Sequence, residues 1–120
     1  MTVVNLINVA TITPVVNAGA VTTSRASIID VAADKVAKVN SLIIANVDGT
    51  NAADITVEVS IDNGSNYVAI AKTVSVAADS SLIVVGKDNG FYLDETDLLA
   101  VTASAASDLT YLVSYELMTD

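Results

Sequence analysis

The chain has 120 residues, a net charge of −9 and a hydrophobic fraction of 52%, and it contains no Cys, His or Trp. This length fits one domain, which buries roughly two thirds of the surface of its unfolded chain without a disulfide or a metal. The missing residue types exclude imidazole bases, Ser-His-Asp triads, thiolate nucleophiles and zinc sites built from Cys or His.

The charge balance argues against nucleic acids and membranes as partners. Fourteen acidic residues face five scattered basic ones, whereas affinity for nucleic acid depends on Lys and Arg that neutralise phosphates. No segment reaches the 18 apolar residues of a membrane-spanning helix, and the N-terminal run lacks the basic residues of a secretory signal. We therefore expect a chain that is made as a soluble protein and binds neither nucleic acid nor a membrane.

Residues 1–22 predict an edge strand that continues into an extended arm. Most of them favour extended backbone, but Pro14 interrupts the pattern, and proline has no N–H to donate within a sheet. We expect an N-terminal arm or edge strand over residues 1–22 and a single β-sandwich domain over residues 23–120.

Residues 26–47 predict two strands. The first covers residues 26–31 and the second ends before the turn pair Asp48-Gly49. Residues 31–39 also fit a short helix, because Ala33, Val36 and Ala37 share a helical face. The surrounding β-branched residues favour a strand–turn–strand arrangement instead, with its turn at residues 33–35.

A β-hairpin is the clearest local feature of the sequence. Apolar and polar residues alternate over residues 55–62, as in a strand with one buried face. Residues 63–66 supply a turn that contains Gly64, and residues 67–71 return as the partner strand.

The pattern of short strands continues downstream. Residues 73–76 alternate, residues 82–85 form a continuous apolar run typical of a strand covered on both faces, and residues 91–93 form a short strand. Residues 99–104 alternate, and the last strand begins after Asp108. That strand places five large residues on one face: Leu109, Tyr111, Val113, Tyr115 and Leu117. We expect Tyr67, Tyr111 and Tyr115 to be the large side chains of the core.

Eight or nine short strands with a turn about every ten residues indicate an all-β fold. We predict an antiparallel β-sandwich, jelly-roll-like or Ig-like, with an extended N-terminal arm.

The sequence contains no pattern that specifies a catalytic, cofactor or metal site. The acidic corner at residues 94–97, near Asp88, lacks the ligand spacing of a calcium loop, as does the segment 48–51, so we interpret both as solvated loops. The glycosylation sequon at residues 63–65 is interpreted as the hairpin turn. Carboxylates are plentiful, but the aromatic residues of a sugar-binding cleft are nearly absent. We therefore predict that the protein is not an enzyme and that it needs no cofactor.

The high hydrophobic fraction predicts self-association. Few charges cover the surface, so we expect apolar area to be buried against other copies or within a larger assembly. A homo-oligomer follows, with a trimer as our first choice, and the alternative is a monomer with an alanine-rich core. The expected contact face carries small residues: Ala100, Thr102, Ser104, Ala105 and Ala106.

Residues 26–117 resemble small β-rich virion structural proteins of tailed bacteriophages, including those of marine and cyanobacterial hosts. The order and spacing of several segments carry the resemblance, and no single motif does. These segments are residues 36–49, 54–59, 71–82, 92–97, 101–109 and 113–116.

The resemblance implies a structural part of a virion, made in the host cytoplasm and exposed on the assembled particle. We favour a capsid decoration or cement protein that stabilises contacts between major capsid subunits, with major capsid protein or other virion proteins as its partners. The alternative is a neck, tail or baseplate component of the same particle. A carbohydrate- or cell-surface-binding β-sandwich module is a more remote alternative. No residue inherits a catalytic role from the resemblance.

Overall fold

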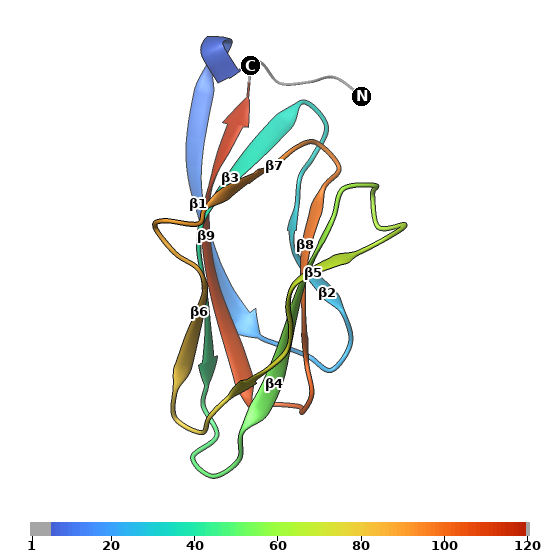
Figure 1. Ribbon diagram of the computed structural model, residues 1–120. Helices are drawn as coiled ribbons and strands as arrows, with labels where there is room; N and C mark the ends of the chain where they lie inside the picture. Colours follow the sequence, from blue (N-terminus) through green and yellow to red (C-terminus); the bar gives the residue numbers. More distant parts are fainter. Residues whose placement is uncertain (1–5, 120) are drawn as a thin grey trace.

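The computed structural model describes residues 6–119 and shows a β-sandwich of two antiparallel sheets (Figure 1). The elements in chain order are a 3₁₀ turn η1 (Leu6–Asn8) and the strands β1 (Thr11–Ala20), β2 (Ala26–Asp30), β3 (Lys35–Asn46), β4 (Ala53–Ser60), β5 (Val68–Val76), β6 (Ser81–Val85), β7 (Phe91–Leu93), β8 (Leu98–Ala103) and β9 (Leu109–Thr119).

The two sheets form the two layers in Figure 1. Sheet A has the strand order β1-β9-β3-β6. β7 also pairs with β3, at residues 37–39, whereas β6 pairs with residues 42–45 of the same strand. Sheet B has the order β2-β8-β4-β5. Apart from β7, the strand pairs are nested: β1 with β9, β2 with β8, β3 with β6, and β4 with β5. An antiparallel ribbon folded over on itself gives this order, which is that of a jelly roll. It is not the Ig-like order, because the last two strands lie in different sheets.

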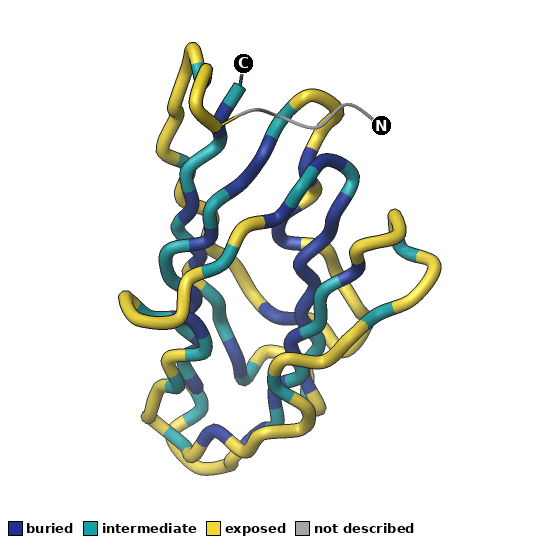
Figure 2. Tube along the Cα trace, turned by 45° about the horizontal axis from the view of Figure 1, so that its top comes forward, coloured by how far each residue is buried: buried dark blue, intermediate teal, exposed yellow. Residues whose placement is uncertain are grey.

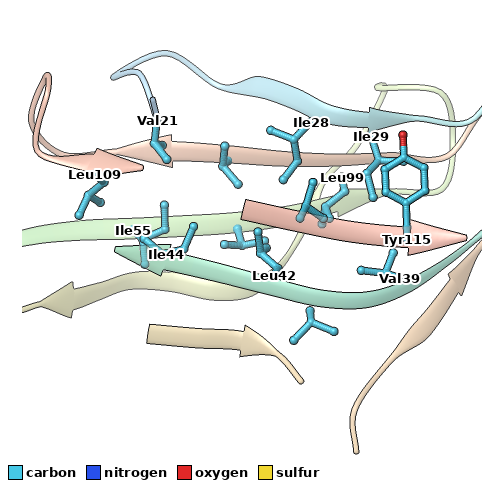
Figure 3. Close-up of a cluster of buried hydrophobic side chains, with 14 of the residues drawn as sticks. Val21, Ile28, Ile29, Val39, Leu42, Ile44, Ile55, Leu99, Leu109 and Tyr115 are labelled. Atoms are coloured by element: carbon cyan, nitrogen blue, oxygen red, sulfur yellow. The ribbon is translucent and has the colours of Figure 1, made fainter. Parts of the chain in front are cut away.

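The core lies between the sheets and contains the side chains that alternate inward along each strand (Figure 3). Leu42, Ile44, Ile55, Leu99 and Leu109 are fully buried, and each such side chain stabilises the fold by about 1.5–3 kcal/mol. The predicted alternation over the last strand holds from Leu109 to Tyr115. Exposed residues lie in the connections between strands and along the edge strands β1 and β5 (Figure 2).

A second, smaller cluster lies at one end of the outer face of sheet A. Val36 and Met118 are neighbours on β3 and β9, and Val9 packs against them. Side chains at these positions point away from the main core, so Val9 covers apolar surface that the sandwich itself leaves open.

The structure confirms the strands predicted from residues 26 to 47 and the turn between them. β2 and β3 lie in different sheets, so their turn crosses from one layer to the other, and Asp34 at the turn has a positive φ of 65°. The short-helix interpretation of residues 31–39 is wrong. The predicted hairpin is β4–β5, and its connection covers residues 61–67.

Two expectations about burial are wrong. The apolar run at residues 82–85 lies in β6, an edge strand, and Ile83 is 65% exposed. The continuous apolar run at residues 82–85 therefore does not indicate a strand covered on both faces. Tyr67 lies outside the core and is half-buried, because the chain leaves β4 before it and bends away, whereas Tyr115 is buried and Tyr111 packs against the core.

Candidate functional site

Part of the outer face of sheet A is exposed and carries no charged side chain. This part is formed by residues 16–20, 41–45, 81–83 and 110–114. Outward positions of β1, β9, β3 and β6 lie side by side there in the observed register. One row across the four strands contains Ala18, Leu112, Ile43 and Ile83. We call this surface the A face, and its members are Val16, Ala18, Ala20, Ser41, Ile43, Ala45, Ser81, Ile83, Thr110, Leu112 and Ser114.

Three large apolar side chains of the A face are exposed to solvent. Val16 is 63% exposed, Ile83 65% and Leu112 42%. Small residues between them leave an open apolar groove of about 570 Å³, which Ala18, Ile43 and Leu112 help to line. With about 4.8 Å between strands and 3.3 Å per residue, the A face covers on the order of 300 Å². Apolar patches of this size on a monomer are often functional.

β1 forms one edge of sheet A, and Pro14 lies on the side of β1 that faces away from the sheet. The Val21 N–H donates to the Leu109 carbonyl at 2.9 Å, and the register between β1 and β9 is continuous. Odd-numbered residues of β1 therefore bond to β9, and even-numbered ones point their backbone groups outward. Pro14 thus removes no hydrogen bond within the sheet, as predicted for an edge strand.

Sheet B, in contrast, carries charged groups on its outer face and is partly covered. Arg25 donates from Nε and Nη2 to the two carboxylate oxygens of Glu58 at 2.9 and 3.1 Å. The Arg25 guanidinium also lies 3.9 Å from the centre of the Tyr67 ring. The Glu58 carboxylate raises the pKa of Arg25, through its hydrogen bond first.

The predicted small-residue contact face on sheet B is wrong for Ala100. This residue lies opposite Glu58 on the central strand β8 and is completely buried. The 61–67 connection folds back over the neighbouring Leu98, which is 8% exposed. Because the chain covers this region itself, Ala100 is not accessible to another backbone. Ser104 and Ala106 remain exposed.

Hydrogen bonds around Asp62 hold the 61–67 connection in place. The Asp62 carboxylate accepts from the Asn66 side chain at 2.8 Å and from the Asn66 backbone at 2.9 Å. The Ser60 hydroxyl donates to the same carboxylate and accepts from the Gly64 N–H. These donors, with the Asn66 side chain first, lower the pKa of Asp62 below its ordinary value.

An apolar cleft of about 340 Å³ lies between β5 and β7, on the opposite side of the sandwich from β1. Leu93 is buried at its base, whereas Ile61, Val68 and Tyr92 are more than half exposed. The cleft is therefore an opening between the edges of the two sheets, and it contains no ionisable group apart from the Tyr92 hydroxyl.

The acidic corner at residues 94–97 is not the solvated loop that we expected. Glu95 is 2% exposed and Asp97 8% exposed. The Asp34 N–H donates to Glu95 Oε2 at 2.7 Å, and the Thr96 N–H donates to the Val31 carbonyl. These bonds join the β7–β8 connection to the β2–β3 turn. Burial, and then the negative charge of Asp94, raise the pKa of Asp97. The corner thus contributes to the fold, which local polarity could not indicate.

The segment 48–51 forms a turn at the opposite end of the sandwich. Asp48 Oδ1 accepts from the Thr50 N–H at 2.8 Å, which is the main cause of the lowered pKa of Asp48. Asp108 lies close by, and burial followed by the Asp48 charge raises its pKa. Within residues 6–119, no group of three acidic side chains is arranged to hold a metal ion. No helix in the same range is long and apolar enough to cross a membrane.

Comparisons with known proteins find solved structures of similar shape but no matching sequence family. No protein-family model and no curated protein sequence matches this chain. A protein of Bacillus endospore appendages, described as a novel family of disulfide-linked pili, matches with a TM-score of 0.50 and 18% identity, over 91% of this chain and 87% of its own. Two structures of a pentameric capsid protein from metagenomic phage sequences match with a TM-score of 0.40 and 17% identity over 96% of this chain. They are longer, and this chain covers 67% and 62% of them.

Proposed function

We propose that this protein is a non-enzymatic structural subunit of an assembled particle and that the A face is its binding surface. The observation that carries the proposal is the absence of charge from this exposed face in a chain whose net charge is −9. Elsewhere the acidic side chains keep copies apart in solution. An uncharged apolar face removes that repulsion at one place and gains free energy when water leaves it.

The size of the A face favours an assembly with many contacts over an isolated dimer. Two such faces together bury about 600 Å², whereas a stable interface buries at least about 1,200 Å². One contact of this kind is weak. Repeated contacts on a particle hold the subunit because each additional contact forms at high effective concentration.

Within this class, we propose a capsid decoration protein exposed on the outside of a phage particle, where it stabilises contacts between major capsid subunits. The order of segments within residues 26–117 supports this proposal through its resemblance to small virion proteins. The domain division into an N-terminal arm or edge strand over residues 1–22 and a sandwich over residues 23–120 belongs to the same proposal, with β1 as the edge strand that faces a neighbouring subunit.

A second candidate is a subunit of a filamentous appendage. The fold shared with the Bacillus pilus protein favours it, since the two chains match over most of both lengths. Disulfide linkage does not carry over, because this chain contains no Cys.

The copy number per particle tests the location. Quantitative mass spectrometry of purified virions should find hundreds of copies, and six or twelve would place the protein in the neck or tail. Absence from every particle would contradict the proposal.

The binding surface is tested with particles that lack this protein. Adding the wild-type protein should raise the temperature at which they release DNA. Leu112→Asp on the A face should abolish this effect, and the matched Ser27→Asp on the outer face of sheet B should retain it. Equal effects of both variants would show that the A face is not the contact.

A further inference from the structure

We infer that the two edges of sheet A pair with each other between copies, β1 of one copy adding to β6 of the next. This inference deepens the proposed function, since it names a second copy of this chain as a partner of the sandwich edge. The contact is head-to-tail, so it produces a ring if the rotation between copies closes and a filament if it does not.

The two edges lack the features that normally prevent such pairing. Edge strands are usually protected by charged side chains, prolines or coverage by other segments. The sequences of β1 and β6 contain no charged residue, and nine of the ten residues of β1 are exposed. Pro14 on β1, and the short length and register shift of β6, are the protective features that these strands do have.

The directions of the strands fit an antiparallel pairing. β1 is antiparallel to β9, β9 to β3, and β3 to β6. A second copy moved sideways without inversion therefore presents its β1 antiparallel to β6. The joined sheet continues the hydrogen-bond pattern of sheet A and merges two A faces into one surface.

The backbone groups that point outward define the register. The Asn46 N–H donates to the Ser80 carbonyl at 2.8 Å, so residues 80 and 82 bond to β3, whereas Ser81 and Ile83 point their groups away from the sheet. On β1 the outward groups belong to even-numbered residues. Pairing Ser81 with Ala20 and Ile83 with Ala18 gives about four hydrogen bonds.

Pro14 and the charges beyond the strand ends agree with this register. Pro14 falls opposite Lys87, in the exposed connection 86–90 that follows β6, where no ladder continues. Glu116 lies beside Pro14 on β9. Lys87 in this connection and Glu116 of the next copy carry opposite charges, and Glu116 accepts a hydrogen bond from the Asn40 side chain of its own chain. The contact thus brings together regions of opposite charge.

Cysteine capture tests the pairing directly, because the natural chain has no Cys. Residues in a hydrogen-bonded pair have Cα atoms about 5.5 Å apart, within the range of a disulfide. We expect a mixture of the single variants Ala20→Cys and Ser81→Cys to form a covalent dimer under mild oxidation. At about 0.1 mM protein, its rate should exceed that of Ala20→Cys mixed with Ser65→Cys at least about tenfold, since paired edges give millimolar effective concentrations.

Proline variants supply a matched control. Ala18→Pro and Ile12→Pro both fall on the outward side of β1, as Pro14 does, so neither removes a bond to β9. Ala18→Pro in the Ala20→Cys chain should reduce cross-linking to the rate of the Ser65→Cys control, and Ile12→Pro should leave it unchanged.

Three results would overturn the inference: a mixed dimer that forms no faster than the control, Ala20→Cys chains that cross-link best with themselves, or equal effects of the two prolines. If cross-linking fails while Leu112→Asp still abolishes the stabilisation of particles, the edge pairing alone is rejected. Successful cross-linking without any Leu112→Asp effect would instead reject the A face as the particle contact.

Discussion

The outer faces of sheets A and B differ in what covers them. On sheet B, the 61–67 connection lies against Leu98, Tyr67 stacks on the Arg25–Glu58 pair, and Ala100 opposite Glu58 is fully buried. On sheet A, the A face has no such cover, and Ile83 and Leu112 remain exposed. The chain thus uses its own residues to cover one face and leaves the other for a partner.

The largest effect should come from placing the same charge on each face. Ala100→Asp puts an unpaired carboxylate at a fully buried position, so we expect a loss of about 2–7 kcal/mol in the free energy of unfolding. Ala18→Asp, at an exposed position on the A face, should change it by about 0.5 kcal/mol or less. Urea denaturation of both variants measures the difference, and equal losses would mean that sheet B is not covered.

A smaller effect should follow from removing the aromatic ring that covers sheet B. Tyr67→Ala removes the stacking with Arg25 and the burial of the half-buried ring, so we expect a loss of about 1–2 kcal/mol. Thermal unfolding measures the loss. Tyr92→Ala, at a ring that is 54% exposed on β7, is the matched control. A larger loss in the control would show that the Tyr67 ring contributes little.

The fold could be predicted because alternation reports which side of a strand is buried. Residues 55–60 and 109–115 show period two, and both segments are strands with one buried face. The alternation predicted through Ile61 is wrong there, because Ile61 lies beyond β4 and is 76% exposed. Alternation does not report what covers the opposite side. Ala100, expected to be exposed, is therefore fully buried between its strand partners Ser27 and Glu58, whereas Ile83, expected to be covered, is 65% exposed on an edge strand.

The burial of the acidic corner at residues 94–97 also depends on contacts that the local sequence does not report. Four polar residues in succession indicate a loop, and residues 94–97 are one. The burial of Glu95 depends on the β2–β3 turn, about 60 residues earlier, whose Asp34 N–H it accepts. The A face could not be located from sequence either, because its four strands come from residues 11 to 119 and meet only in the jelly-roll order.

The smallest predicted effect is a pH dependence of the cover on sheet B. The pKa of Asp62 is lowered in the folded protein, so its ionised form contributes stability above the unfolded pKa, near 3.8, and that contribution is lost as the pH falls through the folded pKa. Asp62→Asn should therefore be less stable than the wild type at pH 7, and the difference should close below about pH 3.8.

Asp108→Asn is the control with the opposite sign. The pKa of Asp108 is raised, so ionisation there opposes folding, and this variant should not lose stability at neutral pH. Melting temperatures between pH 7 and pH 2.5 measure both variants. A difference between Asp62→Asn and the wild type that does not change with pH would show that the Asp62 charge has no part in holding the connection.

Thiol accessibility in the assembled state tests most directly whether the A face is the surface that a partner covers. A single Cys replaces Leu112 on the A face in one variant and Ser27 on sheet B in the other, and each reacts with a maleimide before and after incorporation into particles. We predict that assembly slows labelling at position 112 at least about tenfold and leaves position 27 within about twofold, because buried interface cores exclude solvent. Protection at position 27 with free labelling at position 112 would contradict the account.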